Sequence, residues 1–86
     1  NFTKGFFGTN GVDIDRGFTT PDVKEAMVKE EALYRSRKRF VLCDQSKFDE
    51  ISSITFGDIK EAKIITTNLE ENSRYKQETE IVEVES

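Results

Sequence analysis

Three short apolar runs constrain the fold of this chain more than any other feature. They occupy residues 6–7, 40–43 and 64–65, and each is followed at once by turn-forming or polar residues. Continuous apolar runs of this length are typical of strands buried on both faces of a parallel sheet. The sequence therefore predicts three strands, each of which ends in a polar turn.

A helix is predicted over residues 21–37, between the first and second runs. Thr20 suits the N-cap, Pro21 suits the first helical position, and Asp22 and Glu25 place negative charge in the first turn. Apolar side chains recur at helical spacing and predict a core-facing stripe: Val23, Ala26, Met27, Leu33 and Tyr34, widened by Val28 and Ala32. Basic residues complement the negative end of this helix: Arg35, Arg37, Lys38 and Arg39.

The remaining segments complete an alternating pattern. Residues 51–56 suggest a short strand, residues 58–62 one helical turn, residues 69–78 a polar helix and residues 81–84 an edge or final strand. Alternation of this kind implies right-handed crossovers and an α/β fold, a parallel sheet flanked by helices.

The polar turns predict a binding site. All strands of a parallel sheet end at the same edge, so residues 8–11, 44–47 and 66–68 should gather there, next to the helix start. Ligands of open α/β sheets bind at that edge. The candidate residues are Gly8, Thr9, Asn10, Gly11, Thr19, Thr20, Asp44, Ser46 and Lys47.

The chemistry of these residues favours a phosphorylated polyol. Lys47 supplies a point charge, and glycine-rich turns and helix starts offer backbone N–H groups to anions. Asp44 and Asn10 suit sugar hydroxyls. Each feature also has an ordinary structural interpretation: the glycine turn as a turn, Asp44 as a cap, and Lys47 as a surface charge. The functional interpretation is favoured only because the three clusters are expected to converge on one edge of the sheet.

Composition excludes several functions. The chain has 86 residues, no His, one Cys and a net charge of −4. It therefore lacks a Ser-His-Asp or Cys-His arrangement, a His-ligated metal, a structural zinc site and an internal disulfide. An acidic domain is poorly suited to gripping nucleic acid, and the apolar runs are too short to span a membrane. Cys43 is expected to be a buried core residue. We expect a cytoplasmic protein without metal or cofactor, and the abrupt start predicts a piece of a longer chain.

Three segments resemble a known family in their order and spacing. Residues 6–13, 17–22 and 42–48 are similar to the C-terminal effector-sensor domain of DeoR-type bacterial transcriptional repressors. Glu25, Ala26, Lys29 and residues 64–67 extend the resemblance, which covers residues 4–68.

The resemblance implies a fold and a function. The fold would be that of ribose-5-phosphate isomerase, glucosamine-6-phosphate deaminase and CoA transferase-like proteins, a parallel sheet with helices on both faces. Residues 1–86 would form the C-terminal part of a sugar-phosphate sensor, and a winged helix-turn-helix domain outside this chain would bind DNA. The effector would be a phosphorylated sugar, the target a lactose or fructose phosphotransferase operon, and the full-length protein a homo-oligomer.

The resemblance also bears on the site. The related isomerases carry a Gly-Ala-Asp-Glu turn, whereas this chain has Asn10 and Gly11 at the acidic positions. An amide and a glycine cannot shuttle protons, so we expect binding without catalysis. Asp44 and Lys47 match the family's Asp-x-Ser-Lys-Phe signature, and Glu25 matches an acidic position on the helix. The chain departs from the family at Asp49 and Asn68, and an upstream phosphate-binding loop is absent.

Two other functions remain open from the sequence. The chain could be a sugar-phosphate isomerase with Glu25 or Asp44 as the base, although its turn lacks the acidic pair. It could also be a receiver-like phosphoacceptor module, since Asp44 follows a buried strand. That hypothesis is weakened because no acidic pair follows the first strand to hold Mg²⁺.

Overall fold

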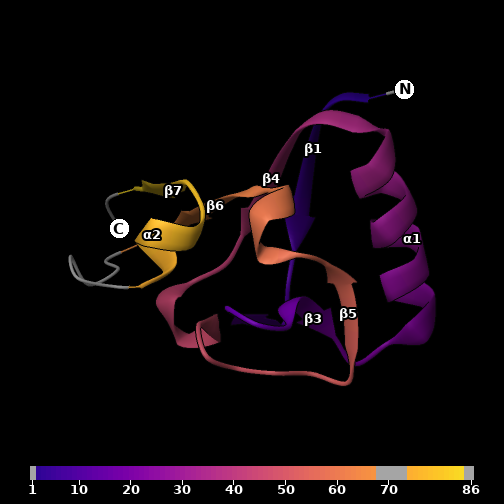
Figure 1. The fold of residues 1–86 in the computed structure, drawn as a ribbon. Coiled ribbons are helices and arrows are strands. Elements are labelled where there is room, and N and C mark those ends of the chain that lie inside the picture. The colour runs from indigo at the N-terminus through magenta and orange to yellow at the C-terminus, as the bar shows by residue number, and fades with distance from the viewer. Residues whose placement is uncertain (1, 68–73, 85–86) are drawn as a thin grey trace.

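The structure, a computed structural model, describes residues 2–67 and 74–84. Its strands are β1 (Phe2–Gly8), β2 (Gly11–Asp13), β3 (Gly17–Thr20), β4 (Ser36–Leu42), β5 (Ile54–Gly57), β6 (Lys63–Thr66) and β7 (Ile81–Glu83). The helices are α1 (Val23–Arg35) and α2 (Tyr75–Glu78), with 3₁₀ turns η1 (Gln45–Lys47) and η2 (Ile59–Glu61) (Figure 1).

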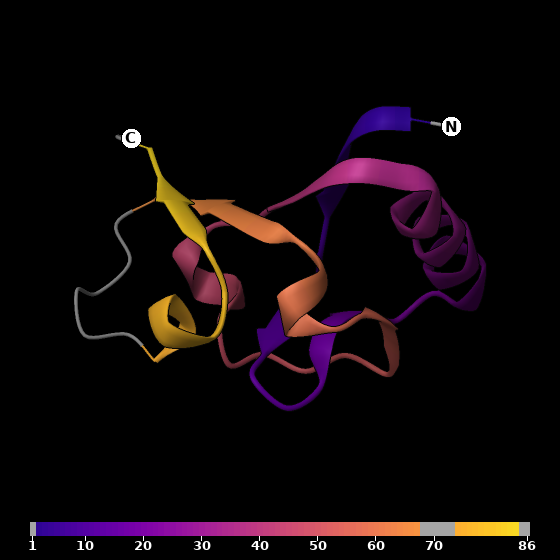
Figure 2. The same cartoon turned by 45° about the horizontal axis from the view of Figure 1, so that its top comes forward.

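Two sheets make up the strand structure. Strands β1, β4, β6 and β7 form a parallel four-stranded sheet in that order, with β1 and β7 at its edges. Strands β2, β3 and β5 form a smaller antiparallel sheet. Figure 2 shows α1 (purple) at one side of the molecule and α2 (yellow) at the other. The predicted α/β class with a mainly parallel sheet is confirmed.

The core lies between the two sheets and α1. Its largest fully buried apolar side chains come from every layer: Phe18 from β3, Leu33 from α1, Ile64 from β6, Val12 from β2 and Val41 from β4. Two stacked rings, Phe18 and Phe56, have centroids 6.1 Å apart. The core therefore ties the small sheet to the large one.

The antiparallel sheet is a correction to the predicted order of elements. We expected a turn and then a helix after the first strand, but β2 and β3 form a hairpin there. The carboxylate of Asp13 accepts hydrogen bonds from the backbone N–H groups of Asp15 (3.0 Å) and Arg16 (2.9 Å). Gly17 follows with φ +79°, where a side chain would collide with the Gly57 carbonyl oxygen. An Asx-type turn closed by glycine thus joins two short strands, of three and four residues, into a hairpin.

The main helix is shorter than predicted. Asp22, rather than Thr20, is the N-cap, and its carboxylate accepts hydrogen bonds from the N–H groups of Lys24 (2.9 Å) and Glu25 (3.2 Å). Thr20 is unavailable because it is buried in β3, paired with Ile54. The helix ends at Arg35, and β4 begins at the next residue. Three residues expected near the helix end therefore lie in the strand: Arg37, Lys38 and Arg39.

The predicted core stripe of the helix is mostly wrong. Ala26 and Leu33 are buried, and Ala32 packs partly against the core. The other predicted members are exposed: Val23, Met27, Val28 and Tyr34. Ala26 and Leu33 face the sheets, while Val23, Met27, Val28 and Tyr34 face outward.

One face of the large sheet is also open, which corrects the prediction that residues 40–43 are buried on both faces. Phe7, Val41 and Ile64 are buried against the core. On the other face Leu42 is 43% exposed and Phe6 is 59% exposed. Within the described residues, α1 and the small sheet cover one face only.

The later segments largely match expectation. Strands β5 and β6, the turn η2 and the edge strand β7 form where predicted. Within the described residues, the predicted polar helix corresponds to α2, Tyr75–Glu78. Residues 69–73 of that predicted helix, and Asn68, lie outside the described residues.

Candidate functional site

Two turns lie side by side at the carboxyl edge of the large sheet. The first follows β1 and the second follows β4, and these strands are paired at their ends, Gly8 with Leu42. Beyond the turns the two segments meet again, because Val12 and Phe48 form an isolated bridge. The bridge is reinforced by the Asp49 N–H, which donates to the Val12 carbonyl oxygen at 2.7 Å. The two turns, residues 9–11 and 43–47, are therefore held next to each other by backbone pairing before and after them.

The first turn is fixed by one hydrogen bond within it and by two that reach Thr19 in β3. The buried Thr9 hydroxyl lies 2.8 Å from the Gly11 carbonyl oxygen and 3.1 Å from that of Thr19, and is the donor to both. The Asn10 N–H also donates to Thr19 O, at 3.1 Å. A side chain at Gly11 would collide with the Glu50 carbonyl, so the backbone approaches closely there. By contrast, the space around the Cα of Gly8 is open.

The second turn is capped by Asp44. One oxygen of its carboxylate accepts hydrogen bonds from the Ser46 N–H, at 3.0 Å, and from the Ser46 hydroxyl. These two hydrogen bonds hold the pKa of the Asp44 carboxyl below its usual value. Within the described residues, nothing donates to the second carboxylate oxygen, and the Lys47 ammonium forms no ion pair. Both groups remain available to a ligand.

Two predicted site residues, Thr19 and Thr20, lie behind the turn rather than at its surface. Both are fully buried in β3. The Thr19 hydroxyl accepts a hydrogen bond from the Ser52 N–H at 2.9 Å, and its carbonyl receives the bonds from the first turn. The Thr20 hydroxyl is buried and has no hydrogen-bond partner among the described residues. Thr19 therefore supports the turn from behind.

Glu25 is brought near the first turn through another residue. Its carboxylate lies 2.7 Å from the ammonium of Lys29, which also donates to the carbonyl oxygen of Gly8 at 2.6 Å. We assigned Lys29 no role from the sequence alone. The signal available was the helical spacing of Glu25 and Lys29, which favours an ion pair.

The third predicted cluster is only partly described. Thr66 is buried and Thr67 is half-buried. A hollow of about 350 Å³ lies at the carboxyl ends of β4 and β6; it is lined by Leu42, Cys43, Asp44, Ile65, Thr66, Thr67 and Val84. Burial, with a smaller contribution from Asp44, raises the pKa of Cys43 to about 11. Its thiol is therefore neutral at pH 7 and a poor nucleophile.

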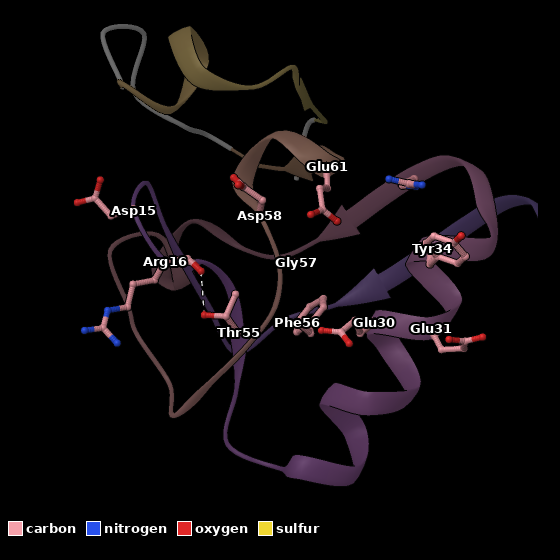
Figure 3. Close-up of a pocket in the computed structure, with 11 residues that line it drawn as sticks. Asp15, Arg16, Glu30, Glu31, Tyr34, Thr55, Phe56, Gly57, Asp58 and Glu61 are labelled. Atoms are coloured by element: carbon pink, nitrogen blue, oxygen red, sulfur yellow. Dashed lines mark hydrogen bonds between the residues drawn. The ribbon is translucent and has the colours of Figure 1, made fainter.

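A larger hollow, of about 930 Å³, lies elsewhere. Its lining comes from α1, β4, β5, the β2–β3 turn and the segment from Asp58 to η2. Figure 3 shows that its side chains do not converge, with Asp15 and Glu31 at opposite ends of the view. Five carboxylates and two arginines line it, a balance that repels an anion. We therefore assign the phosphate-like chemistry to the carboxyl edge and not to this hollow.

The described residues offer neither a metal site nor a membrane-spanning helix. No three His, Cys, Asp or Glu side chains among them group closely enough to hold a metal ion. No helix in the same part of the chain is long and apolar enough to cross a membrane.

Comparison with known proteins reveals clear relatives. The sequence profile of the DeoR C terminal sensor domain matches residues 1–69. The chain is 51% identical over 70 residues to the uncharacterized HTH-type transcriptional regulator FruR of Bacillus subtilis (strain 168), an alignment that covers 81% of this chain and 28% of the relative. It is 34% identical over 68 residues to the HTH-type transcriptional regulator GlpR of Haloferax volcanii, covering 79% of this chain and 27% of the relative.

A third relative is the deoxyribose operon repressor of Escherichia coli (strain K12). It is 29% identical over 63 residues, which cover 73% of this chain and 25% of the relative. In each of these comparisons, the aligned part of the chain spans between 25% and 28% of the relative's length.

Proposed function

The chain belongs to the DeoR C-terminal sensor domain family, and we propose that it is the part of a transcriptional repressor's sensor that binds a phosphorylated sugar. The proposed site is the carboxyl edge of the large sheet, at the turns of residues 8–11 and 44–47. The relatives are named as transcriptional regulators, and one is named as an operon repressor.

The observation that carries this proposal is the pairing of the two turns. Gly8 with Leu42 and Val12 with Phe48 hold the turns together at both ends. One turn offers an open glycine and the other offers Lys47 without an ion-pair partner in the described residues. A cation beside a glycine-rich turn suits a phosphate group.

The hydroxyl-bearing part of the ligand would lie against Asp44 and Asn10. The second carboxylate oxygen of Asp44 can accept from a sugar hydroxyl, because the Ser46 bonds occupy the first oxygen. Asn10 is exposed and its amide can donate and accept. This division, one phosphate and several hydroxyls, is the reason for proposing a phosphorylated sugar.

The mechanism would be a population shift. An effector that binds one arrangement of the sensor better than another favours that arrangement, and thereby changes the DNA affinity of a linked domain. In this proposal DNA is contacted by a winged helix-turn-helix domain of the longer protein, which acts as a homo-oligomer. The effector's preference for one arrangement sets the size of the response.

We propose binding without catalysis. Asn10 and Gly11 leave the first turn without a carboxylate, and Glu25 is held in an ion pair with Lys29. Asp44 keeps one free carboxylate oxygen, but its hydrogen bonds from Ser46 lower the pKa of that carboxyl, which makes it a weak general base.

For the sugar, we propose fructose phosphates and tagatose 6-phosphate as the first candidates, with a lactose or fructose phosphotransferase operon as the target. The chemistry of the site suits a phosphate and neighbouring hydroxyls, which these compounds share.

The test is calorimetry on the longer regulator that contains this chain. It would be titrated with fructose 1-phosphate, fructose 6-phosphate and tagatose 6-phosphate, and with the unphosphorylated sugars. We expect one phosphate to bind and to change DNA affinity in a fluorescence anisotropy assay. Lys47→Met should weaken that binding by about 10- to 100-fold, because it removes a charge-assisted hydrogen bond.

Lys38→Met is the matched control, because Lys38 is an exposed lysine near the start of β4, the strand that Lys47 follows. It should leave effector affinity unchanged. Absence of binding by every phosphate, with DNA release unaffected, would contradict the proposal. An equal loss of affinity in both lysine variants would contradict the placement of the site.

A further inference from the structure

Lys29 occupies an unusual position for a helix lysine. It lies at the middle of α1, and its side chain is only 17% exposed. Its ammonium lies 2.7 Å from Glu25 Oε1 and 5.2 Å from the centre of the Phe56 ring. It also donates to the carbonyl oxygen of Gly8 at 2.6 Å. A shielded ammonium requires such partners, because burial of an unpaired charge is costly.

The contact with Gly8 reaches the first turn of the candidate site. Gly8 is the last residue of β1, and β1 is an edge strand of the large sheet. A hydrogen bond from an ammonium to a carbonyl is charge-assisted and stronger than a neutral one. The peptide group is planar, so a fixed Gly8 carbonyl also fixes the direction of the Thr9 N–H. Lys29 thereby sets the point at which the chain leaves the strand.

We propose that Lys29 is the positioning residue of the first turn. Its ammonium holds the Gly8 carbonyl, and so couples α1 to residues 8–11 in the absence of effector. The consequence for effector affinity rests on the proposed function; the consequence for the turn itself does not. Lys29 acts through the backbone of Gly8 and need not touch the ligand.

Glu25 has a subsidiary part in this arrangement. It lies one helical turn before Lys29 and pairs with the same ammonium, so it steadies the lysine. If Lys29 mattered only for the stability of α1, loss of either partner would have similar effects. If Lys29 positions the turn, loss of Lys29 removes the Gly8 bond, whereas loss of Glu25 leaves it in place.

The first readout is backbone amide hydrogen exchange in the longer regulator without effector, followed by mass spectrometry of peptides that span residues 9–11. The Asn10 N–H is bonded to Thr19 O, so its exchange reports opening of the turn. We expect Lys29→Met to exchange at least about tenfold faster there than the wild type. Glu25→Gln should exchange at close to the wild-type rate, and Lys29→Arg should restore much of the protection.

Lys24→Met is the control on the same helix, because Lys24 is exposed and has no ion pair among the described residues. It should leave exchange of the turn unchanged. If Lys29→Met does not fold, Lys29→Gln, which keeps a neutral donor, takes its place and should show intermediate protection. Turn exchange in the Lys29 variants equal to that in Lys24→Met would overturn the proposal. So would an increase that Glu25→Gln reproduces in full.

The second readout is calorimetric titration of the same variants with fructose 1-phosphate. We expect Lys29→Met to raise the dissociation constant about fivefold or more, since a loosened turn must be ordered on binding. If the wild type binds no sugar phosphate but the exchange result holds, the proposed function fails and the positioning role of Lys29 stands. If the wild type binds and Lys29→Met binds equally well, the link from turn to effector is overturned.

Discussion

Phe6 and Phe7 are neighbours in β1 and carry the same side chain, yet Phe6 is 59% exposed and Phe7 is 8% exposed. They point to opposite faces of the large sheet because side chains alternate along a strand. The same contrast holds in β4, where Val41 is buried and Leu42 is 43% exposed. The two faces have similar apolar side chains, but the described elements cover only one of them.

The helix α1 shows the same division. Leu33 and Ala26 pack into the core, while Met27 is 67% exposed and Tyr34 faces outward as well. The comparison teaches that an apolar side chain in this chain stabilises the fold only where a described element covers it. Apolar character alone does not identify the covered side.

The largest expected effect comes from the two neighbouring phenylalanines. Phe7→Ala should lower the free energy of unfolding of this chain by about 3–5 kcal/mol, because it leaves a cavity in the core. Phe6→Ala should cost about 1 kcal/mol, since its ring packs mainly against Phe40. Urea denaturation followed by circular dichroism measures both. Equal losses would show that the open face contributes as much as the covered one.

The same pair sharpens the comparison when it is measured in a longer regulator that contains this chain. Large exposed apolar patches on soluble proteins generally mark surfaces that are covered by something else. We therefore expect the difference between Phe6→Ala and Phe7→Ala to narrow there. An unchanged difference would mean that the face stays open in the longer protein.

Some of this architecture could be predicted because its signals are local. The apolar runs at residues 40–43 and 64–65 mark the strands β4 and β6, and the polar turns after β1 and β4 meet at one edge. The β2–β3 hairpin is harder to predict, because its strands have only three and four residues and are too short to show a periodic pattern. Coverage of a face is a nonlocal property, and alternation cannot reveal it.

The candidate site divides in the same way. The positions of Asp44 and Lys47 follow from a strand end, which the sequence marks. The burial of Thr19 and Thr20 follows from β3 pairing with β2 and β5, so their distance from the surface depends on a sheet that the sequence did not predict. The link from Lys29 to Gly8 joins residues 21 positions apart and depends on how α1 packs on β1. Local sequence patterns can locate the carboxyl edge of the sheet, but not the residues from other elements that hold its turns in place.

A second prediction applies the comparison to α1. Leu33→Ala should destabilise the chain by about 2–5 kcal/mol, because Leu33 is fully buried. Met27→Ala should change stability by no more than about 0.5 kcal/mol, since its side chain is mostly in solvent and alanine is a good helix former. Both variants can be compared by urea denaturation under the same conditions. A large loss in Met27→Ala would contradict the division of the helix into two sides.

The smallest effect concerns what the open face contributes by itself. Phe6 and Phe40 are paired in register on β1 and β4, and their rings stack with centroids 5.2 Å apart. A double-mutant cycle with Phe6→Ala and Phe40→Ala isolates their interaction, which we expect to be about 0.5–1.5 kcal/mol. In the cycle, the energy that each ring gains by burial against other residues cancels. The coupling energy therefore reports the ring stack alone.

A coupling energy within that range would mean that the open face stabilises this chain mainly through cross-strand side-chain pairs, which stabilise sheets in general. A coupling near zero would mean that the Phe6 and Phe40 rings contribute nothing until another surface covers them. In that case the apolar side chains that stabilise this part of the protein through β1 and β4 are those of the covered face, Phe7 and Val41. The energy of the Phe6–Phe40 stack is thus the most direct measure of what the open face contributes to stability.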